Sequence, residues 1–195
     1  NYMNEWSQKD FFENSIKLHD ALPQYSEKIV NTNKNKKIKL AFLSSDIRNN
    51  HSITGFLKTV VTNVNKNKFE LILFSNCKIN KEDKTSKDFQ NFFDEWINIS
   101  SLNDIEAISE IRKYSIDIII DLMGLSSSNR IALFKNRLAP TQILWLGYNN
   151  TSGLKEMDYL MVDPNLIEKK EAKFYSEKLL FLPSIWNCHS GFTSS

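Results

Sequence analysis

The chain has 195 residues, of which 41% are hydrophobic, and its 25 basic and 23 acidic side chains leave a formal net charge of +2. This length and apolar content suffice for one sizeable domain and exclude a globally disordered chain. The near-balance of charge disfavours a nucleic-acid binder, which would concentrate basic residues on one face. No apolar run approaches the length of a membrane span, so no membrane segment is expected.

The first predicted element is an amphipathic helix over residues 5–22, where apolar side chains recur at mixed three- and four-residue steps. Trp6 and the paired Phe11 and Phe12 are expected to belong to its buried stripe. His19 lies on the same helix and is interpreted as a structural or surface histidine.

A polar connector is expected over residues 24–37, after Pro23 ends the helix. The basic stretch over 33–39 is interpreted as a solvated linker rather than an anion-binding site. Residues 1–36 are therefore predicted to be a helical linker, and residues 37–195 the globular domain.

Short apolar segments then alternate with helical ones. Each apolar segment is followed by turn residues, which is typical of a buried strand. The expected strands are 38–44, 69–75, 95–100, 116–124, 141–148, 157–163 and 177–183. The expected helices are 53–65, 85–94, one from Asn103 or Asp104 to Tyr114, 129–137 and 166–175.

This alternation predicts an α/β fold, a Rossmann-like parallel sheet with helices on both faces. Right-handed crossovers place all strand-to-helix loops at one edge of such a sheet, and ligands bind outside the carboxyl ends of the strands. The loops over 44–52, 124–128 and 147–153 should therefore gather at that edge.

The first of these loops contains the lone His51, with Asp46 and Arg48 close by in sequence. No glycine separates Ser44 from His51, which excludes a dinucleotide-binding fingerprint, and no P-loop, zinc-ligand spacing or nucleophile elbow occurs. Asp46 and Arg48 are candidates for a charge pair that orients the loop. His51 is either a functional imidazole at the sheet edge or a cap of the following helix.

The other two loops are rich in small polar residues. Residues 147–153, GYNNTSG, offer backbone N–H groups to a phosphate or sugar, or simply form a connecting loop. Residues 124–130, GLSSSNR, allow the same two interpretations, and one of the serines is a candidate helix cap. Arg130 and Arg137 stand on either side of the next helix and are expected to be solvated rather than catalytic.

Several segments together resemble one known family. KIKLAFLSSDIRNNHSITGFL (37–57) resembles the opening strand and loop of the catalytic region in the O-linked N-acetylglucosamine transferase and SPINDLY family, glycosyltransferase family 41. LAPTQILWLGYNNTSGLKEMDYLMVDP (138–164) is similar to that family's Ala-Pro-x-Gln, Trp-x-Gly-Tyr, Thr-Ser-Gly and Met-Asp-Tyr series, and YSEKLLFLP (175–183) to the segment after it. The likeness runs from about residue 37 to residue 188.

The resemblance implies a two-lobed fold of the glycosyltransferase B type, of which this chain is the amino-terminal lobe alone. The carboxyl-terminal lobe, which supplies most contacts to the sugar nucleotide, has no counterpart among these residues. Residues 1–36 correspond to the family's link from tetratricopeptide-type repeats. By the same resemblance, His51 matches the histidine at the sugar-nucleotide cleft, either a general base or a positioning donor. The implied substrate-binding residues are Asp46, Gly124, Gly147, Tyr148, Thr151 and Ser152.

The implied reaction transfers N-acetylglucosamine or fucose to Ser or Thr hydroxyls of a protein acceptor, with inversion and without a metal or cofactor. UDP-N-acetylglucosamine or GDP-fucose is the implied donor, and the isolated lobe is expected to fold but not to turn over. Its only cysteines, Cys77 and Cys188, are far apart, so no disulfide framework is expected and a cytoplasmic location is predicted.

The chain departs from the family pattern at Leu125, where the family often has His or Tyr, and at Asn149 and Asn150, which replace Pro-Gly. These changes leave a second hypothesis open, a non-catalytic Rossmann-like module that binds a partner or glycan. A third hypothesis, an unrelated nucleotide-binding module, is disfavoured by the joint match of several motifs.

Overall fold

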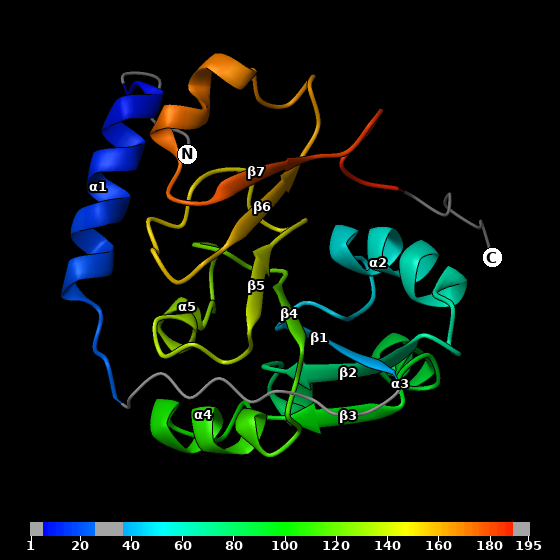
Figure 1. The fold of residues 1–195 in the computed structure, drawn as a ribbon. Helices are drawn as coiled ribbons and strands as arrows, with labels where there is room; N and C mark the ends of the chain where they lie inside the picture. The colour runs from blue at the N-terminus through cyan, green and yellow to red at the C-terminus, as the bar shows by residue number, and fades with distance from the viewer. Residues whose placement is uncertain (1–5, 26–36, 189–195) are drawn as a thin grey trace.

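The computed structural model describes residues 6–25 and 37–188, and the structural statements below concern these ranges. Helices and strands alternate along the chain, as Figure 1 shows. The elements are α1 (Gln8–Ala21), β1 (Ile38–Ser44), α2 (Ser52–Asn63), β2 (Phe69–Ser75), the 3₁₀ helix η1 (Ile79–Lys81), α3 (Lys84–Gln90), β3 (Glu95–Asn98), α4 (Asp104–Arg112), β4 (Ile118–Asp121), α5 (Ile131–Phe134), β5 (Thr141–Leu144), β6 (Tyr159–Val162), the 3₁₀ helix η2 (Lys169–Phe174) and β7 (Lys178–Phe181).

The strands form one sheet of seven in the order β3-β2-β1-β4-β5-β6-β7, and every neighbouring pair is parallel. The predicted α/β fold with a parallel sheet is therefore confirmed. From β1 the chain builds outward to β3, then returns to β4 and builds the other way to β7. The junction of β1 and β4 is thus the switch point, where open α/β sheets bind their ligands.

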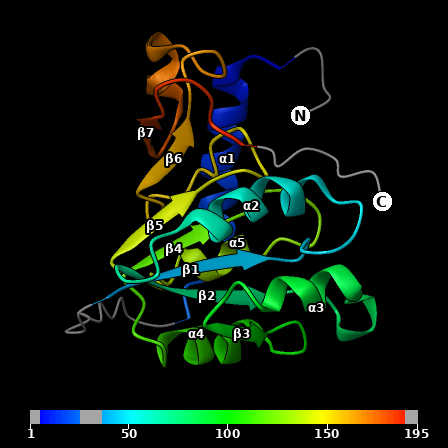
Figure 2. The ribbon, with the colours of Figure 1, turned by 90° about the vertical axis from the view of Figure 1, so that its right-hand side faces the viewer.

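Side chains on both faces of the sheet are buried, as the apolar strand pattern predicts. Ile72 and Phe74 of β2 enter a core cluster shared with α4 and α5. Leu71 and Leu73 alternate with them and enter a second cluster shared with α2 and α3. Figure 2 shows α2 and α4 on opposite sides of the sheet. The period of two along each strand therefore decides which core a residue joins.

Several helices are shorter than the sequence pattern predicts. The helix expected over 85–94 is α3, which ends at Gln90. Beyond it, Asp94 is bonded to β2, because its carboxylate accepts the Leu71 N–H at 2.7 Å and its own N–H donates to the Leu71 carbonyl at 2.8 Å. Pairing of Asp94 with β2 thus prevents the helix from continuing over the whole predicted range.

Three further expectations about length are wrong. The helix expected over 129–137 is the single turn α5, and that expected over 166–175 is the 3₁₀ helix η2. The strand expected over 116–124 ends at Asp121, whose carboxylate accepts the backbone N–H groups of Met123 and Gly124 and so turns the chain.

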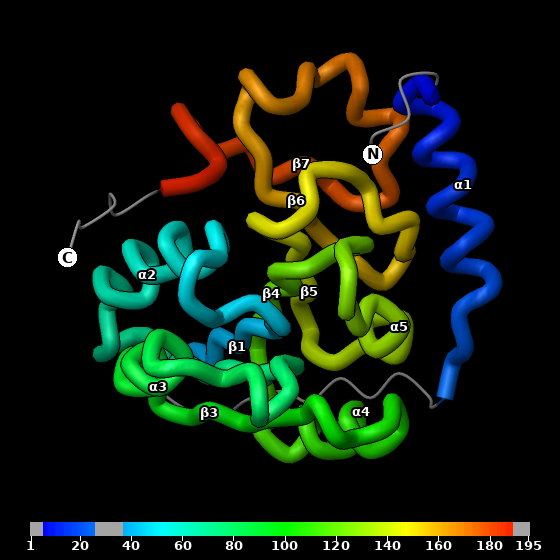
Figure 3. Tube along the Cα trace, turned by 180° about the vertical axis from the view of Figure 1, so that it is seen from behind, coloured from blue at the N-terminus to red at the C-terminus, as the bar shows by residue number. Residues whose placement is uncertain are grey.

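Helix α1 packs beside α5, away from the strands, in both Figure 1 and Figure 3. Its buried residues are Ser15 and His19, whereas Trp6 is 39% exposed. The expectation that Trp6 lies in a buried stripe is therefore wrong, while Phe11 and Phe12 are half-buried. The helix faces the domain with a small and a polar side chain, because its partner there is a polar loop region.

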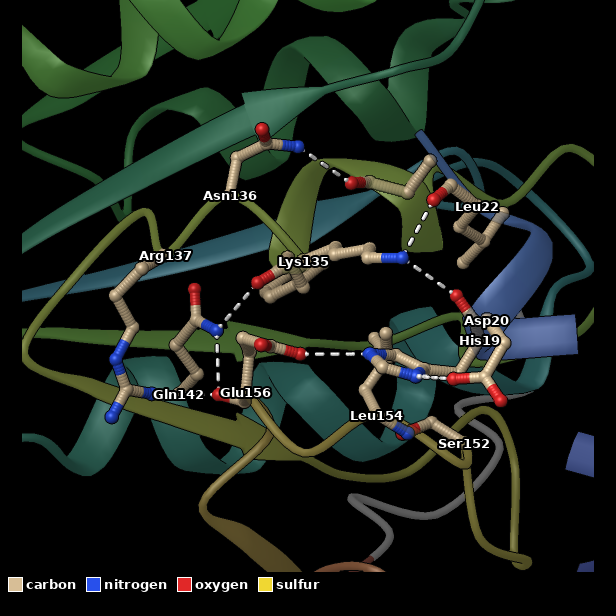
Figure 4. A network of polar contacts seen from close by, with 12 residues as sticks. His19, Asp20, Leu22, Lys135, Asn136, Arg137, Gln142, Ser152, Leu154 and Glu156 are labelled. Atoms are coloured by element: carbon tan, nitrogen blue, oxygen red, sulfur yellow. Dashed lines mark hydrogen bonds and ion pairs between the residues drawn. The ribbon is translucent and has the colours of Figure 1, made fainter. Parts of the chain in front are cut away.

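A cluster of charged groups holds α1 in place, and we call it the helix anchor: His19, Asp20, Lys135 and Glu156 (Figure 4). The His19 ring places Nε2 3.0 Å from a Glu156 carboxylate oxygen and Nδ1 3.2 Å from an Asp20 oxygen. The Lys135 ammonium donates to the carbonyls of His19 and Leu22 at 2.8 and 2.6 Å. A cation there satisfies carbonyls that the helix end leaves open. Most of the connector expected over 24–37 lies outside the described residues.

Candidate functional site

A polar cavity of about 420 Å³, which we call the cleft, opens at the switch point between β1 and β4. All three loops that the topology was expected to gather contribute to it, so this prediction is confirmed. Its walls are formed by Asp46, Arg48, His51, Ser52, Ile53, Lys81, Leu122, Ser126, Ser127, Ser128, Leu146 and Gly147.

His51 stands at the N-cap position of α2, but its side chain makes no capping hydrogen bond. The ring nitrogen Nδ1 is buried and has no hydrogen-bond partner among the described residues. The other nitrogen, Nε2, lies 3.6 Å from a carboxylate oxygen of Asp46, and the side chain is 30% exposed. The imidazole thus lines the cleft with the exposed part of its ring, whereas Nδ1 is covered.

The loop that carries His51 is fixed by short-range bonds. Asp46 Oδ1 lies 3.5 Å from the Arg48 guanidinium, which confirms the charge pair expected between them. The Thr54 hydroxyl donates to the Arg48 carbonyl at 2.9 Å and accepts the Arg48 N–H at 3.2 Å, which ties the loop to the first turn of α2. Asp46 is therefore placed beside a guanidinium and an imidazole at once.

Two glycines allow the loops after β4 and β5 to approach each other behind the cleft wall. A Cβ on Gly147 would lie 1.9 Å from the Leu122 carbonyl oxygen. Gly124 has φ +54°, and a Cβ there would lie 2.4 Å from the Cβ of Tyr148. Gly147 itself lines the cleft, whereas Gly124 and Tyr148 support it from behind and Tyr148 packs against the core.

Thr151 and Ser152 do not line the cleft. Both are buried and turn toward Glu177, the residue before β7. The Thr151 hydroxyl donates to Glu177 Oε2 and the Ser152 N–H to Oε1, each at 2.8 Å, and the Ser152 hydroxyl donates to Oε1 as well. Burial raises the pKa of Glu177, while these bonds oppose that rise. In this chain the two hydroxyls fasten a loop.

Asp121, at the carboxyl end of β4, was not singled out from the sequence. It is 1% exposed, and burial raises its pKa to about 7 although two backbone N–H groups donate to it. These bonds, from Met123 at 3.0 Å and Gly124 at 2.9 Å, shape the turn that carries Leu122 into the cleft wall. A signal was present, because Asp121 is a charged residue at the end of the most apolar predicted strand.

Backbone strain gathers at the cleft rim. Asn50, Ser128 and Leu146 have φ values of 57°, 62° and 77°, in the left-handed region that non-glycine residues rarely adopt. Each such conformation costs on the order of 1–3 kcal/mol and persists only where the surroundings enforce it. Ser128 and Leu146 line the cleft, and Asn50 precedes His51.

The expectation that Arg130 and Arg137 are solvated is wrong. Arg130 lies 2.8 Å from Asp104 with 14% of its side chain exposed. Arg137 donates to both carboxylate oxygens of Asp158, at 2.7 and 2.8 Å. Both guanidiniums join elements that lie far apart in sequence, and neither lines the cleft.

Within residues 6–25 and 37–188, no group of three or more His, Cys, Asp or Glu side chains is arranged to hold a metal ion. No helix in the same ranges is long and apolar enough to cross a membrane. Cys77 and Cys188 are both free thiols.

The chain matches the model of glycosyl transferase family 41 over residues 10–189. A probable UDP-N-acetylglucosamine–peptide N-acetylglucosaminyltransferase SPINDLY of Arabidopsis thaliana is 26% identical over 201 residues, which cover 97% of this chain and 21% of the plant protein. A UDP-N-acetylglucosamine–peptide N-acetylglucosaminyltransferase of Caenorhabditis elegans is 25% identical over 149 residues, or 76% of this chain and 13% of the worm protein.

Among solved structures, an O-GlcNAc transferase mutant of Thermobaculum terrenum superposes with a TM-score of 0.86 and 24% identity. The superposition covers 95% of this chain and 36% of the bacterial one, and it shows a shared fold. The chain spans about a fifth of the length of the plant relative.

Proposed function

The chain belongs to glycosyltransferase family 41, and from this premise we propose that it is the amino-terminal lobe of a protein O-glycosyltransferase. The proposed reaction moves N-acetylglucosamine from UDP-N-acetylglucosamine to a Ser or Thr hydroxyl of a protein, with inversion. The observation that carries the proposal is the cleft at the switch point, where the His51 imidazole faces a cavity with Nδ1 unpartnered among the described residues.

We assign the role of general base to His51. As the acceptor hydroxyl attacks the anomeric carbon, its proton passes to the imidazole, the new C–O bond forms, and the bond to the nucleoside diphosphate breaks. A carboxylate oxygen of Asp46 lies 3.6 Å from Nε2, beside the ring that receives the proton. The nucleoside diphosphate leaves with the electron pair of the broken bond.

The amino terminus of α2 supports the departure of that diphosphate. Ser52 and Ile53, its first residues, line the cleft, and no side chain caps this helix end. Exposed N–H groups and the helix dipole favour negative charge at such a terminus. The remaining contacts to the sugar nucleotide are proposed to come from a second lobe, because this chain spans about a fifth of the plant relative.

The non-catalytic alternative is weakened by where the departures from the family pattern lie. Leu125 packs against the core, and Asn149 and Asn150 are absent from the cleft walls. Asn150 instead accepts a hydrogen bond from Gln8 of α1 at 2.6 Å and one from the Thr151 N–H at 2.7 Å. These substitutions therefore leave the cleft around His51 as the enzyme hypothesis requires it.

Leu18 of α1 and Trp6, just before this helix, are both exposed, which supports the further proposal that preceding helical repeats pack here. The two free thiols, Cys77 and Cys188, support a reducing compartment, and we propose the cytoplasm.

The test is sugar transfer by the full-length protein to acceptor peptides, with UDP-N-acetylglucosamine and GDP-fucose compared as donors. Transfer from UDP-N-acetylglucosamine is expected, and none is expected from the 195-residue chain alone. His51→Gln separates the two roles of the imidazole, because glutamine can donate a hydrogen bond but cannot take the proton. Turnover of His51→Gln at the normal rate would reject the general-base role, and no transfer with either donor would reject the proposed function.

A further inference from the structure

A second polar cavity, of about 360 Å³, adjoins the cleft. Asp46, Arg48, Lys81 and Ser128 line both cavities, so the two share a wall. We call it the basic groove, and it is lined by Ser45, Asp46, Arg48, Asn76, Cys77, Lys78, Lys81, Ser100, Ser128, Asn129 and Arg130.

The carboxylates around the groove are bound to groups of the protein itself. Asp46 pairs with Arg48, and Asp104 pairs with Arg130 at 2.8 Å. Glu82 accepts a hydrogen bond from the Asn98 amide at 2.8 Å. Asp46 and Asp104 are thus paired with guanidiniums, whereas Glu82 has a neutral hydrogen-bond partner and does not itself line the groove.

Two cationic side chains of the groove have no ion-pair partner among the described residues. Lys78 and Lys81 are exposed, and their ammonium groups form no ion pair with any residue in the described ranges. Lys78 is the N-cap of the one-turn helix η1 and Lys81 is its last residue, and both line the groove. The groove therefore presents two ammonium groups without an ion-pair partner in the described ranges next to the cleft.

The surroundings of these lysines suit a polypeptide better than a small anion. Ile79, between them in the chain, is 71% exposed and offers an apolar contact that an inorganic anion cannot use. Ser45, which lines the groove and is 7% exposed, has a hydroxyl oxygen without a hydrogen-bond partner among the described residues.

We propose that the basic groove binds acidic side chains of the acceptor polypeptide, so that Lys78 and Lys81 select acceptors with Asp or Glu on one side of the modified hydroxyl. This inference rests on the proposed function, because it takes the cleft beside His51 as the place where the acceptor hydroxyl reacts. Because the two cavities share a wall, one extended segment is long enough to reach from one into the other.

The test uses the full-length protein and three acceptor peptides that share one Ser. The residues that flank this Ser are Asp in the first peptide, Asn in the second and Lys in the third. The Asp peptide is expected to have a KM about three- to tenfold below that of the Asn peptide, with kcat little changed, because exposed ion pairs are individually weak. Raising the salt concentration should reduce this preference.

Charge reversal makes the test specific. Lys78→Glu should raise KM for the Asp peptide more than for the Asn peptide and so reduce the preference between them, with kcat little changed, since Lys78 lies outside the cleft. The double variant Lys78→Glu with Lys81→Glu should favour the Lys peptide. Lys155→Glu with Lys178→Glu is the matched control, because both lysines are exposed and lie outside the groove.

Two results would overturn the inference. One is equal KM values for the three peptides in the unaltered protein. The other is a double variant whose KM for the nucleotide sugar rises equally with every peptide, which would assign the groove to the donor diphosphate.

The proposed function fails separately, if no peptide is modified at all. Fluorescence anisotropy of the labelled peptides then decides the inference by binding alone. The inference is supported if the unaltered protein binds the Asp peptide more tightly than the other two and the double variant does not. Equal binding of all three peptides to the unaltered protein would reject the inference.

Discussion

The helix anchor and the cleft each contain a histidine beside carboxylates, yet the two imidazoles have different surroundings. His19 is 6% exposed, and both of its ring nitrogens lie within 3.2 Å of a carboxylate oxygen. His51 is more open, its Nδ1 is buried without a partner in the described part of the chain, and its nearest carboxylate contact is 3.6 Å. Both nitrogens of the His19 ring have a carboxylate partner, whereas Nδ1 of the His51 ring has none among the described residues.

This difference distinguishes polar atoms that are bonded within the fold from polar atoms that have no partner there. An unpaired buried polar atom costs about 1–3 kcal/mol, so a folded chain retains one mainly where a ligand later satisfies it. The hydroxyls of Thr151 and Ser152 belong with the anchor by this criterion, because Glu177 accepts hydrogen bonds from both.

The largest expected effect concerns activity. His51→Ala in the full-length protein should lower kcat by roughly 10²- to 10⁴-fold, the range in which general bases contribute. Its melting temperature should stay the same or rise, because the change removes a buried nitrogen that has no partner among the described residues. A His51→Ala protein that melts much earlier would mean that the imidazole is structural, like His19.

The second prediction concerns pH and the buried Asp121 carboxyl at the end of β4. The pKa of Asp121 is raised from 3.8 to about 7, so between these values the folded state keeps a proton that the unfolded state releases. Stability should therefore fall as pH rises through this window, by at most about 4 kcal/mol, and level off above it. Urea titrations between pH 4 and 8 should show that Asp121→Asn removes this decline. The same slope in both proteins would contradict the prediction.

The third prediction compares glycines in the two regions. Gly147→Ala should destabilise the chain by about 3 kcal/mol, because the added Cβ would lie 1.9 Å from a backbone oxygen that cannot swing away. Gly153→Ala should also destabilise, but by displacing α1, since its Cβ would meet the Ser15 carbonyl at 2.3 Å. Hydrogen exchange should locate the loosening near β4 and β5 in the first variant and in α1 in the second. If both variants showed increased exchange in the same segments, the prediction that the two glycines support different regions would be wrong.

The smallest expected effect is at the helix anchor. Glu156→Leu should cost about 2 kcal/mol, because His19 Nε2 loses its carboxylate partner in a buried site. Glu156→Gln is the matched control and should recover most of that loss, since its amide oxygen still accepts a hydrogen bond. Neither variant should alter kcat. A drop in kcat for Glu156→Gln would show that the anchor is coupled to the cleft.

Much of this architecture could be predicted from local patterns. The alternation of apolar strands and helices predicts the parallel sheet, and the rule for right-handed crossovers predicts that the loops near His51 and Gly147 meet at one edge. Both expectations are confirmed, because burial on two faces constrains every strand residue and leaves a strong signal in the sequence.

The partners of polar side chains could not be predicted in this way. Glu177 bonds to Thr151 across 26 positions, and His19 bonds to Glu156 across 137. Local periodicity contains no information about such pairs. His19 in α1 is buried and Trp6, just before this helix, is exposed. The difference depends on which distant residues pack against each side chain, and the spacing of apolar residues along the helix does not reveal it.

The sequence by itself therefore determined the class of fold, the edge of the sheet where the loops near His51 and Gly147 meet and the family to which the chain belongs. Only the tertiary structure decided which histidine is bonded and which is free, and which hydroxyls fasten a loop. The reason is physical. Apolar burial follows a short period along the chain, whereas hydrogen bonds depend on which distant groups the crossovers bring within about 3 Å of one another.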